Sequence, residues 1–120
     1  MSFVETEIDG QIMIVRLNRP ERLNALSTVI RNGMAEAFNR YHEDNDLEVA
    51  ILTGTGRGFC AGEDMKESID RGIPGSPKEF VEENLVDPLQ TGLLQKPVIA
   101  AVNGFAMGGG FMLAERADLR

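Results

Sequence analysis

The chain of 120 residues has no tryptophan, one cysteine and an excess of acidic over basic residues. The single Cys60 cannot form an intrachain disulfide framework, and it suits a reducing compartment. Asp and Glu outnumber Lys and Arg by 19 to 12, so the net charge of -7 argues against a nucleic-acid-binding chain held by a basic face. The acidic N-terminal residues lack the apolar core of a signal peptide. We therefore expect a cytoplasmic chain, with residues 1–120 in a single domain.

One stretch without charge, Pro97–Ala114, is close to the length of a membrane-spanning helix. It contains Asn103 and four glycines, and each interior glycine costs a helix about 1 kcal/mol relative to alanine. A buried strand, a tight glycine turn and the start of a buried helix explain the composition better. We expect no transmembrane segment.

Four strands are predicted. Val4–Ile8 and Gln11–Leu17 flank the turn-prone Asp9-Gly10 and are expected to form a hairpin. The runs Val49–Leu52 and Pro97–Val102 are continuously apolar, which is typical of strands buried on both faces.

Two helices are predicted between these strands. Ser27 is a candidate N-cap for the first, and Ser76-Pro77-Lys78-Glu79 forms a capping box for the second, which Pro88 should bend or end. Apolar residues recur at helical spacing in the first helix, at Ile30, Met34, Ala37, Phe38 and Tyr41. Strands alternating with helices predict an α/β fold with at least partly parallel strands.

Two glycine-rich stretches follow the two apolar strands. The first, residues 54–62, holds four glycines and leads into Glu63-Asp-Met-Lys-Glu, which is expected to form a first helical turn. The second, residues 103–110, ends in three consecutive glycines before an apolar helix. Each is open to interpretation as a structural turn or as a source of unpaired amide donors for a ligand oxygen. If both lie at the same edge of a parallel sheet, their amides could converge as an oxyanion hole.

Three motifs together resemble the crotonase superfamily of enoyl-CoA hydratases and isomerases: Arg19–Leu26 (RPERLNAL), Phe59–Lys66 (FCAGEDMK) and Pro97–Gly110 (PVIAAVNGFAMGGG). The resemblance implies a crotonase-like α/β spiral of ββα units, of which this chain would be the N-terminal half, because complete members are about twice this length. It implies an acyl-CoA thioester as substrate, no prosthetic group, no metal, and a homotrimer or hexamer at full length. It also predicts exposed apolar faces on the last strands and on the helix near Gly110.

The resemblance places the two oxyanion-hole amides at Glu63 and Gly109. It assigns the substrate and CoA site to Arg22, Ala25, Ala61, Glu63, Asp64, Met65, Lys66 and Gly109. Residues 16–31 carry a local charge of +3, from Arg16, Arg19, Arg22 and Arg31 against Glu21, and could meet the CoA phosphates. A solvated surface position stays open for Arg22 and Lys66, and a capping role stays open for Asp64. Cys60 is expected to be a small buried residue, and His42 to favour a helix end without a catalytic role.

The sequence departs from the hydratase pattern at Met112. Hydratases of the superfamily carry a glutamate two residues after the glycine triplet, and methionine cannot transfer a proton. Glu115 lies about 5.4 Å further along the same helix face, which makes it a poor substitute. The reaction is therefore not specified. Two hypotheses remain: an acyl-CoA enzyme, and a non-catalytic binding or assembly module with the same fold.

Overall fold

The structure, a computed structural model, describes residues 3–63 and 87–120. The predicted helix that starts at Ser76 lies outside these residues. So do three residues of the predicted site, Asp64, Met65 and Lys66.

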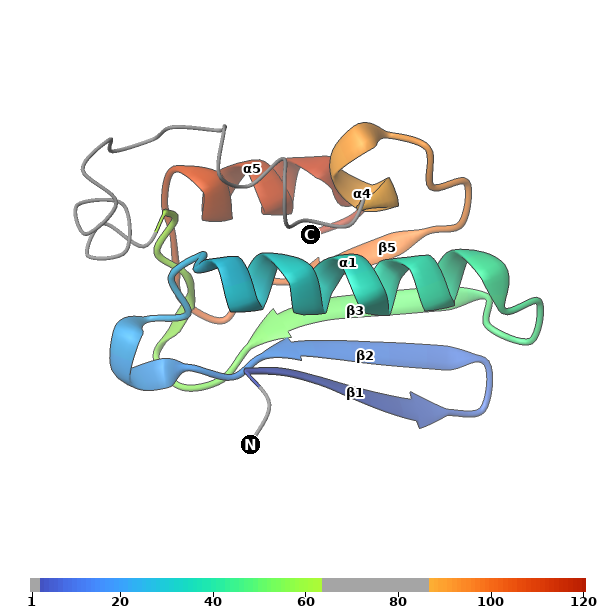
Figure 1. Cartoon of the computed structure of the whole chain (residues 1–120), viewed down its shortest axis with the longest axis horizontal. Coiled ribbons are helices and arrows are strands. Elements are labelled where there is room, and N and C mark those ends of the chain that lie inside the picture. Colours follow the sequence, from blue (N-terminus) through green and yellow to red (C-terminus); the bar gives the residue numbers. More distant parts are fainter. Residues whose placement is uncertain (1–2, 64–86) are drawn as a thin grey trace.

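A four-stranded sheet with the order β1-β2-β3-β5 forms the base of the molecule (Figure 1). β1 (Val4–Asp9) and β2 (Ile12–Leu17) pair antiparallel, which confirms the predicted hairpin. β3 (Val49–Gly54) and β5 (Val98–Ala101) join in parallel, so the expected partly parallel sheet is also confirmed.

A second, smaller sheet is made by β4 (Gly58–Cys60) and β6 (Phe105–Ala106), which pair in parallel. Each follows directly on a strand of the main sheet, β4 on β3 and β6 on β5. The chain therefore leaves the main sheet at the same edge twice and turns each time into the small sheet. This repeated turn brings the two glycine-rich stretches side by side.

α1 (Thr28–Glu43) lies along one face of the main sheet (Figure 1). Its N-cap is the predicted one, because the hydroxyl oxygen of Ser27 accepts a hydrogen bond from Ile30 N at 3.3 Å. The residues predicted to face the core are all buried: Ile30, Met34, Ala37, Phe38 and Tyr41.

Among the described residues, the helical layer also contains α4 (Pro88–Thr91) and α5 (Gly109–Arg116), and a 3-10 turn, η1 (Pro20–Arg22), follows β2. Pro88 occupies the first turn of α4, after Asp87 caps that helix by accepting from Leu89 N at 2.9 Å. Proline is tolerated there because the first amides of a helix have no intrahelical partner.

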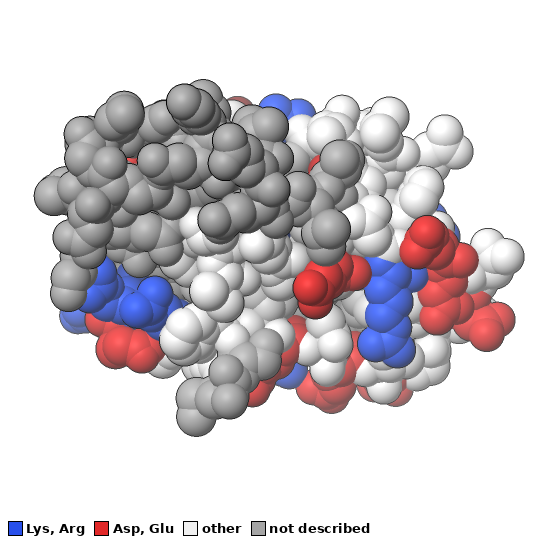
Figure 2. Space-filling view, viewed as in Figure 1, with Lys and Arg blue, Asp and Glu red and all other residues white. Residues whose placement is uncertain are grey.

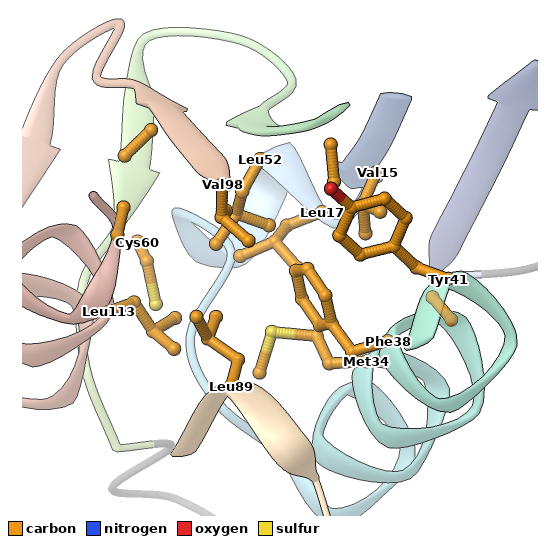
Figure 3. Packing of buried hydrophobic residues seen from close by; sticks show 14 of the residues in the cluster. Val15, Leu17, Met34, Phe38, Tyr41, Leu52, Cys60, Leu89, Val98 and Leu113 are labelled. Atoms are coloured by element: carbon orange, nitrogen blue, oxygen red, sulfur yellow. The ribbon is translucent and has the colours of Figure 1, made fainter. Parts of the chain in front are cut away.

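The core lies between the main sheet and the helices. Figure 3 shows Leu17, Leu52 and Val98 of the sheet meeting Phe38 of α1 and Leu113 of α5. The opposite sheet face differs from expectation: Ile51 and Ile99 stay half-exposed, so β3 and β5 alternate and are not buried on both faces. The continuous apolar runs of these strands predicted burial on both faces, and this prediction is wrong because α1 covers only one face of the sheet.

Lys96 joins the C-terminal end of α1 to the start of β5. Its ammonium donates to the carbonyls of Tyr41, Asp44 and Leu47 at 2.7, 2.6 and 2.8 Å, and lies 4.9 Å from the Tyr41 ring centroid. A cation is favourable at this end of a helix, where carbonyls lack amide partners. The contact fixes how β5 enters the sheet.

Large apolar side chains are exposed around β6, α5 and the end of the chain, as expected. They are Phe105, Met107, Phe111, Met112 and Leu119, each between 49% and 63% exposed. None of the helices within the described residues is both long and apolar enough to cross a bilayer.

Candidate functional site

Three loops meet at one edge of the main sheet. β2, β3 and β5 run parallel, so the segments after them all emerge at their carboxyl ends. These segments are residues 18–26, 54–63 and 102–109. In open sheets of this kind, ligands bind beyond the carboxyl ends of the strands.

The loop of residues 18–26 has two consecutive residues in the left-handed region, Leu23 with φ 51° and Asn24 with φ 55°. Such angles are uncommon outside glycine, although asparagine tolerates them. The turn leaves Arg22 half-buried and Ala25 buried at 9% exposure.

This loop is hydrogen-bonded to the end of the first glycine-rich stretch. Leu26 N donates to the Gly62 carbonyl at 2.6 Å, and Ala61 N donates to the Leu23 carbonyl at 3.0 Å. Leu26 and Glu63 form an isolated parallel bridge, so Glu63 is extended and the helical turn expected to start there does not include it. This bridge uses the N–H of Leu26, which donates to the Gly62 carbonyl. The N–H of Glu63 takes no part in that bond and points to the other side of its own strand.

The second glycine-rich stretch packs directly on the first. Gly62 has φ 96°, and a Cβ there would lie 2.7 Å from the Met107 carbonyl oxygen and 3.4 Å from Gly109 N. No side chain fits this contact, which explains the glycine. Met107 N also donates to the Cys60 carbonyl at 3.1 Å.

α5 begins at Gly109, after Gly108 at φ 51°. The amide of Gly110 donates to the Met107 carbonyl at 2.8 Å and that of Met112 donates to the Gly108 carbonyl at 3.1 Å. Gly109 is the first residue of the helix, so its own N–H has no partner within the helix. The structure thus brings Glu63 and Gly109 together, with Ala61 beside them, and Arg22 and Ala25 on the loop bonded to Ala61.

Met112 and Glu115 follow on α5, and both are exposed. Within residues 3–63 and 87–120, no group of His, Cys, Asp and Glu side chains is arranged to hold a metal.

Cys60 is fully buried, as expected, and its Sγ donates to the Asn24 carbonyl at 3.2 Å. Burial raises the pKa of its thiol, which disfavours the thiolate that nucleophilic chemistry requires. His42 lies exposed in the last turn of α1, the helix end to which the sequence assigns it.

The sequence interpretation missed Asn24 and Asn103 as residues that organise the site. Asn24 is fully buried, and its side-chain amide donates to the carbonyls of Thr55, Gly58 and Phe59 at 3.1, 3.0 and 3.3 Å. Asn103 donates to those of Gly56 and Gly58 at 2.9 and 3.2 Å. Each of these asparagines lies next to a turn inside one of the three motifs. Because asparagine side chains at turns often bond nearby backbone groups, this position could have indicated their role.

Charge is unevenly distributed around the three loops. Figure 2 shows basic side chains gathered at the end of the molecule where η1 lies, with acidic ones beside them. The centre of that face carries few charges. A positive end next to amide donors suits an anionic, elongated ligand.

The fold and the loops define a class: an α/β chain in which ββα turns bring two glycine-rich loops to one sheet edge. The family model described as enoyl-CoA hydratase/isomerase matches residues 7–120, and the chain belongs to this family, within the crotonase superfamily.

Named relatives agree with the family. The chain is 38% identical to the 1,2-epoxyphenylacetyl-CoA isomerase of Escherichia coli K12 over 99% of this chain and 47% of that protein. It is 40% identical to the carnitinyl-CoA dehydratase of Proteus mirabilis, over 92% of this chain and 41% of that protein.

A crystal structure of an enoyl-CoA hydratase/carnithine racemase from Magnetospirillum magneticum matches with a TM-score of 0.87 and 36% identity, covering all of this chain and 46% of that one. The chain spans less than half the length of these relatives. The expected match to about half of a crotonase fold is therefore confirmed.

Proposed function

We propose that this chain binds an acyl-CoA thioester and stabilises the enolate derived from it with the backbone amides of Glu63 and Gly109. The observation that carries the proposal is the approach of the two glycine loops, where a Cβ at Gly62 would lie 3.4 Å from Gly109 N. Two N–H groups aimed at one oxygen stabilise the negative charge that develops there, and one such donor is worth about 2.7–4 kcal/mol.

The CoA moiety is assigned to the loop of residues 18–26, with Arg22 near a phosphate and Ala25, Ala61 and Glu63 along the pantetheine and thioester. The local excess of Arg over Glu in residues 16–31 supports this assignment. Both relatives described above carry CoA thioesters in their names. Asp64, Met65 and Lys66 belong to the same proposal on the sequence alone.

The reaction class is acid–base chemistry at the carbons next to a polarised thioester, as in hydration or isomerisation. No residue of this chain is assigned as the acid or base. Met112 cannot transfer a proton, and Glu115 lies a turn beyond it on α5. The acyl-CoA is a substrate, and the proposal needs no prosthetic group or metal.

We further propose that the natural protein is a cytoplasmic homotrimer or hexamer, without a nucleic-acid or membrane partner. The exposed apolar side chains of β6 and α5, among them Phe105 and Phe111, support association with further protein surface. Sedimentation of the natural protein as a monomer would contradict the oligomer.

A non-catalytic binding or assembly module is the second candidate, and Met112 is the observation that favours it. An activity screen separates the two candidates. The natural protein, at its full length, is incubated with saturated, 2-enoyl and 3-enoyl CoA thioesters while product formation and α-proton exchange are followed. Turnover supports the enzyme, and tight binding without turnover or exchange supports the module.

A further inference from the structure

Two asparagines from opposite sides of the site donate to the same carbonyl oxygen. The Gly58 oxygen accepts from Asn24 Nδ2 at 3.0 Å and from Asn103 Nδ2 at 3.2 Å. Asn24 comes from the loop after β2, Asn103 from the segment after β5, and Gly58 begins β4 in the loop between them. One oxygen thus ties together all three loops of the candidate site.

Asn24 is the buried member of this pair of asparagines. Its side-chain oxygen accepts from Arg19 N at 2.8 Å, which holds its own loop closed, while its amide nitrogen donates to the neighbouring loop. A Cβ at Gly54 would lie 2.8 Å from that nitrogen, so the strand end must be glycine to let the amide reach its carbonyls. The loops therefore approach this closely only with a donor amide between them.

Asn103 is the exposed member of the pair. Its side-chain oxygen accepts from Gly54 N at 3.2 Å, and its nitrogen donates to the Gly56 and Gly58 carbonyls. The same side chain therefore bonds both arms of the turn between β3 and β4. Because the residue is exposed, replacing it leaves the hydrophobic core intact.

We propose that Asn103, together with Asn24, is a positioning residue that sets the direction of the Glu63 and Gly109 amides through the Gly58 carbonyl. This inference rests on the proposed function. β4 runs from Gly58 to Cys60, whose carbonyl accepts from Met107 N at 3.1 Å, just before α5 begins. A shift of Gly58 is thereby passed to both loops, and amide donors displaced by about 1 Å lose much of their effect on a reacting oxygen.

The test measures carbonyl polarisation directly, using the CoA thioester of 4-dimethylaminocinnamic acid. Its absorption band moves to longer wavelength when the thioester oxygen accepts hydrogen bonds, because they draw electron density from the amine toward the carbonyl. The natural protein at full length is compared with Asn103→Asp and Asn103→Ala. Asn103→Asp keeps the acceptor for Gly54 N but replaces the donor with a charged carboxylate oxygen, and Asn103→Ala removes the donor without adding charge. Thr91→Val is the matched control, because it removes a hydroxyl that donates to the Asp87 carbonyl at 3.2 Å in α4 and bonds neither Asn103 nor Gly58.

We expect the wild type and Thr91→Val to show the full red shift at saturation. Both Asn103 variants should lose about half of it or more, while their dissociation constants for the probe change by no more than about threefold. Asn24→Asp should lose the shift as well, with a lower melting temperature because its side chain is buried. A full red shift in both Asn103 variants would overturn the positioning role and leave the proposed function standing. A wild type that shows no red shift would overturn the proposed function, and the positioning role with it.

Discussion

Gly62 and Gly109 are in backbone contact: a Cβ atom on Gly62 would lie 3.4 Å from the amide nitrogen of Gly109. The two residues follow different strands of the main sheet, and the parallel pairings of β3 with β5 and of β4 with β6 bring them together. The contact requires a glycine at position 62, where a Cβ would also lie 2.7 Å from the Met107 carbonyl oxygen. It also places the start of α5 next to the extended Glu63, the two residues whose amides the proposed function assigns to the thioester oxygen.

Gly109→Pro should strongly weaken the polarisation of a bound thioester, because proline has no N–H and only the Glu63 amide remains as a donor. Proline is otherwise acceptable at the first position of a helix, so α5 should still form. The matched control is Gly109→Ala, which keeps the N–H and adds a Cβ that would meet only the Leu26 side chain, at 2.7 Å. We expect kcat to fall by about 100-fold or more in the proline variant and far less in the alanine variant. Equal losses in the two variants would assign the effect to crowding by the added carbon.

Gly110→Ala should destabilise the fold more than Gly109→Ala does. A Cβ on Gly110 would overlap the backbone carbonyl of Cys60, which cannot move without shifting β4, whereas the Leu26 side chain next to Gly109 can rotate away. We expect a loss of about 1–3 kcal/mol in the free energy of unfolding, measured by urea denaturation. Equal stability of the two variants would mean that β4 and α5 are packed less closely than described.

Lys96→Met should lower the free energy of unfolding by about 2 kcal/mol, because a charged donor then no longer satisfies three carbonyls at the end of α1. Arg40→Met is the control, since Arg40 lies exposed in the last turn of the same helix and should change stability by no more than about 0.5 kcal/mol. A similar loss of unfolding free energy in both variants would show that Lys96 acts only through its charge near the helix end and not through its hydrogen bonds.

Tyr41 should make the fold sensitive to alkaline pH. Burial raises the pKa of its phenol from 10.0 to about 12, so between these values the folded chain keeps a proton that the unfolded chain has lost. Its contribution to stability is therefore complete below pH 10.0 and is lost as the pH rises toward about 12. Tyr41→Phe removes this dependence, along with the hydrogen bond to the Pro97 carbonyl at 2.7 Å. Unfolding free energies measured between pH 9 and 12 should fall less steeply in the variant. Identical slopes would show that other groups control this range.

Local patterns predicted the elements well where one short stretch of chain determines them. The Asp9-Gly10 turn, the Ser27 cap and the periodicity of α1 each depend on neighbouring residues, and all three predictions are confirmed. Glu63 was assigned less well. Glu63 is extended because Leu26, from a distant loop, bridges to it.

The candidate site was predictable only in part, because its geometry depends on contacts between loops. The resemblance to the crotonase superfamily pointed to Glu63 and Gly109, and the structure brings these two residues together. The shared Gly58 carbonyl was not foreseeable, since it requires Asn24 and Asn103 to arrive from two different strands. Propensity describes each asparagine as a turn residue and contains no information about which carbonyl it will find.

The most direct test of the account is a crystal structure of the natural protein with a bound acyl-CoA. The account predicts that the thioester oxygen lies about 3 Å from both the Glu63 and the Gly109 amide nitrogens, with the CoA phosphates near the loop of residues 18–26. A thioester oxygen bound away from these two amides would contradict it.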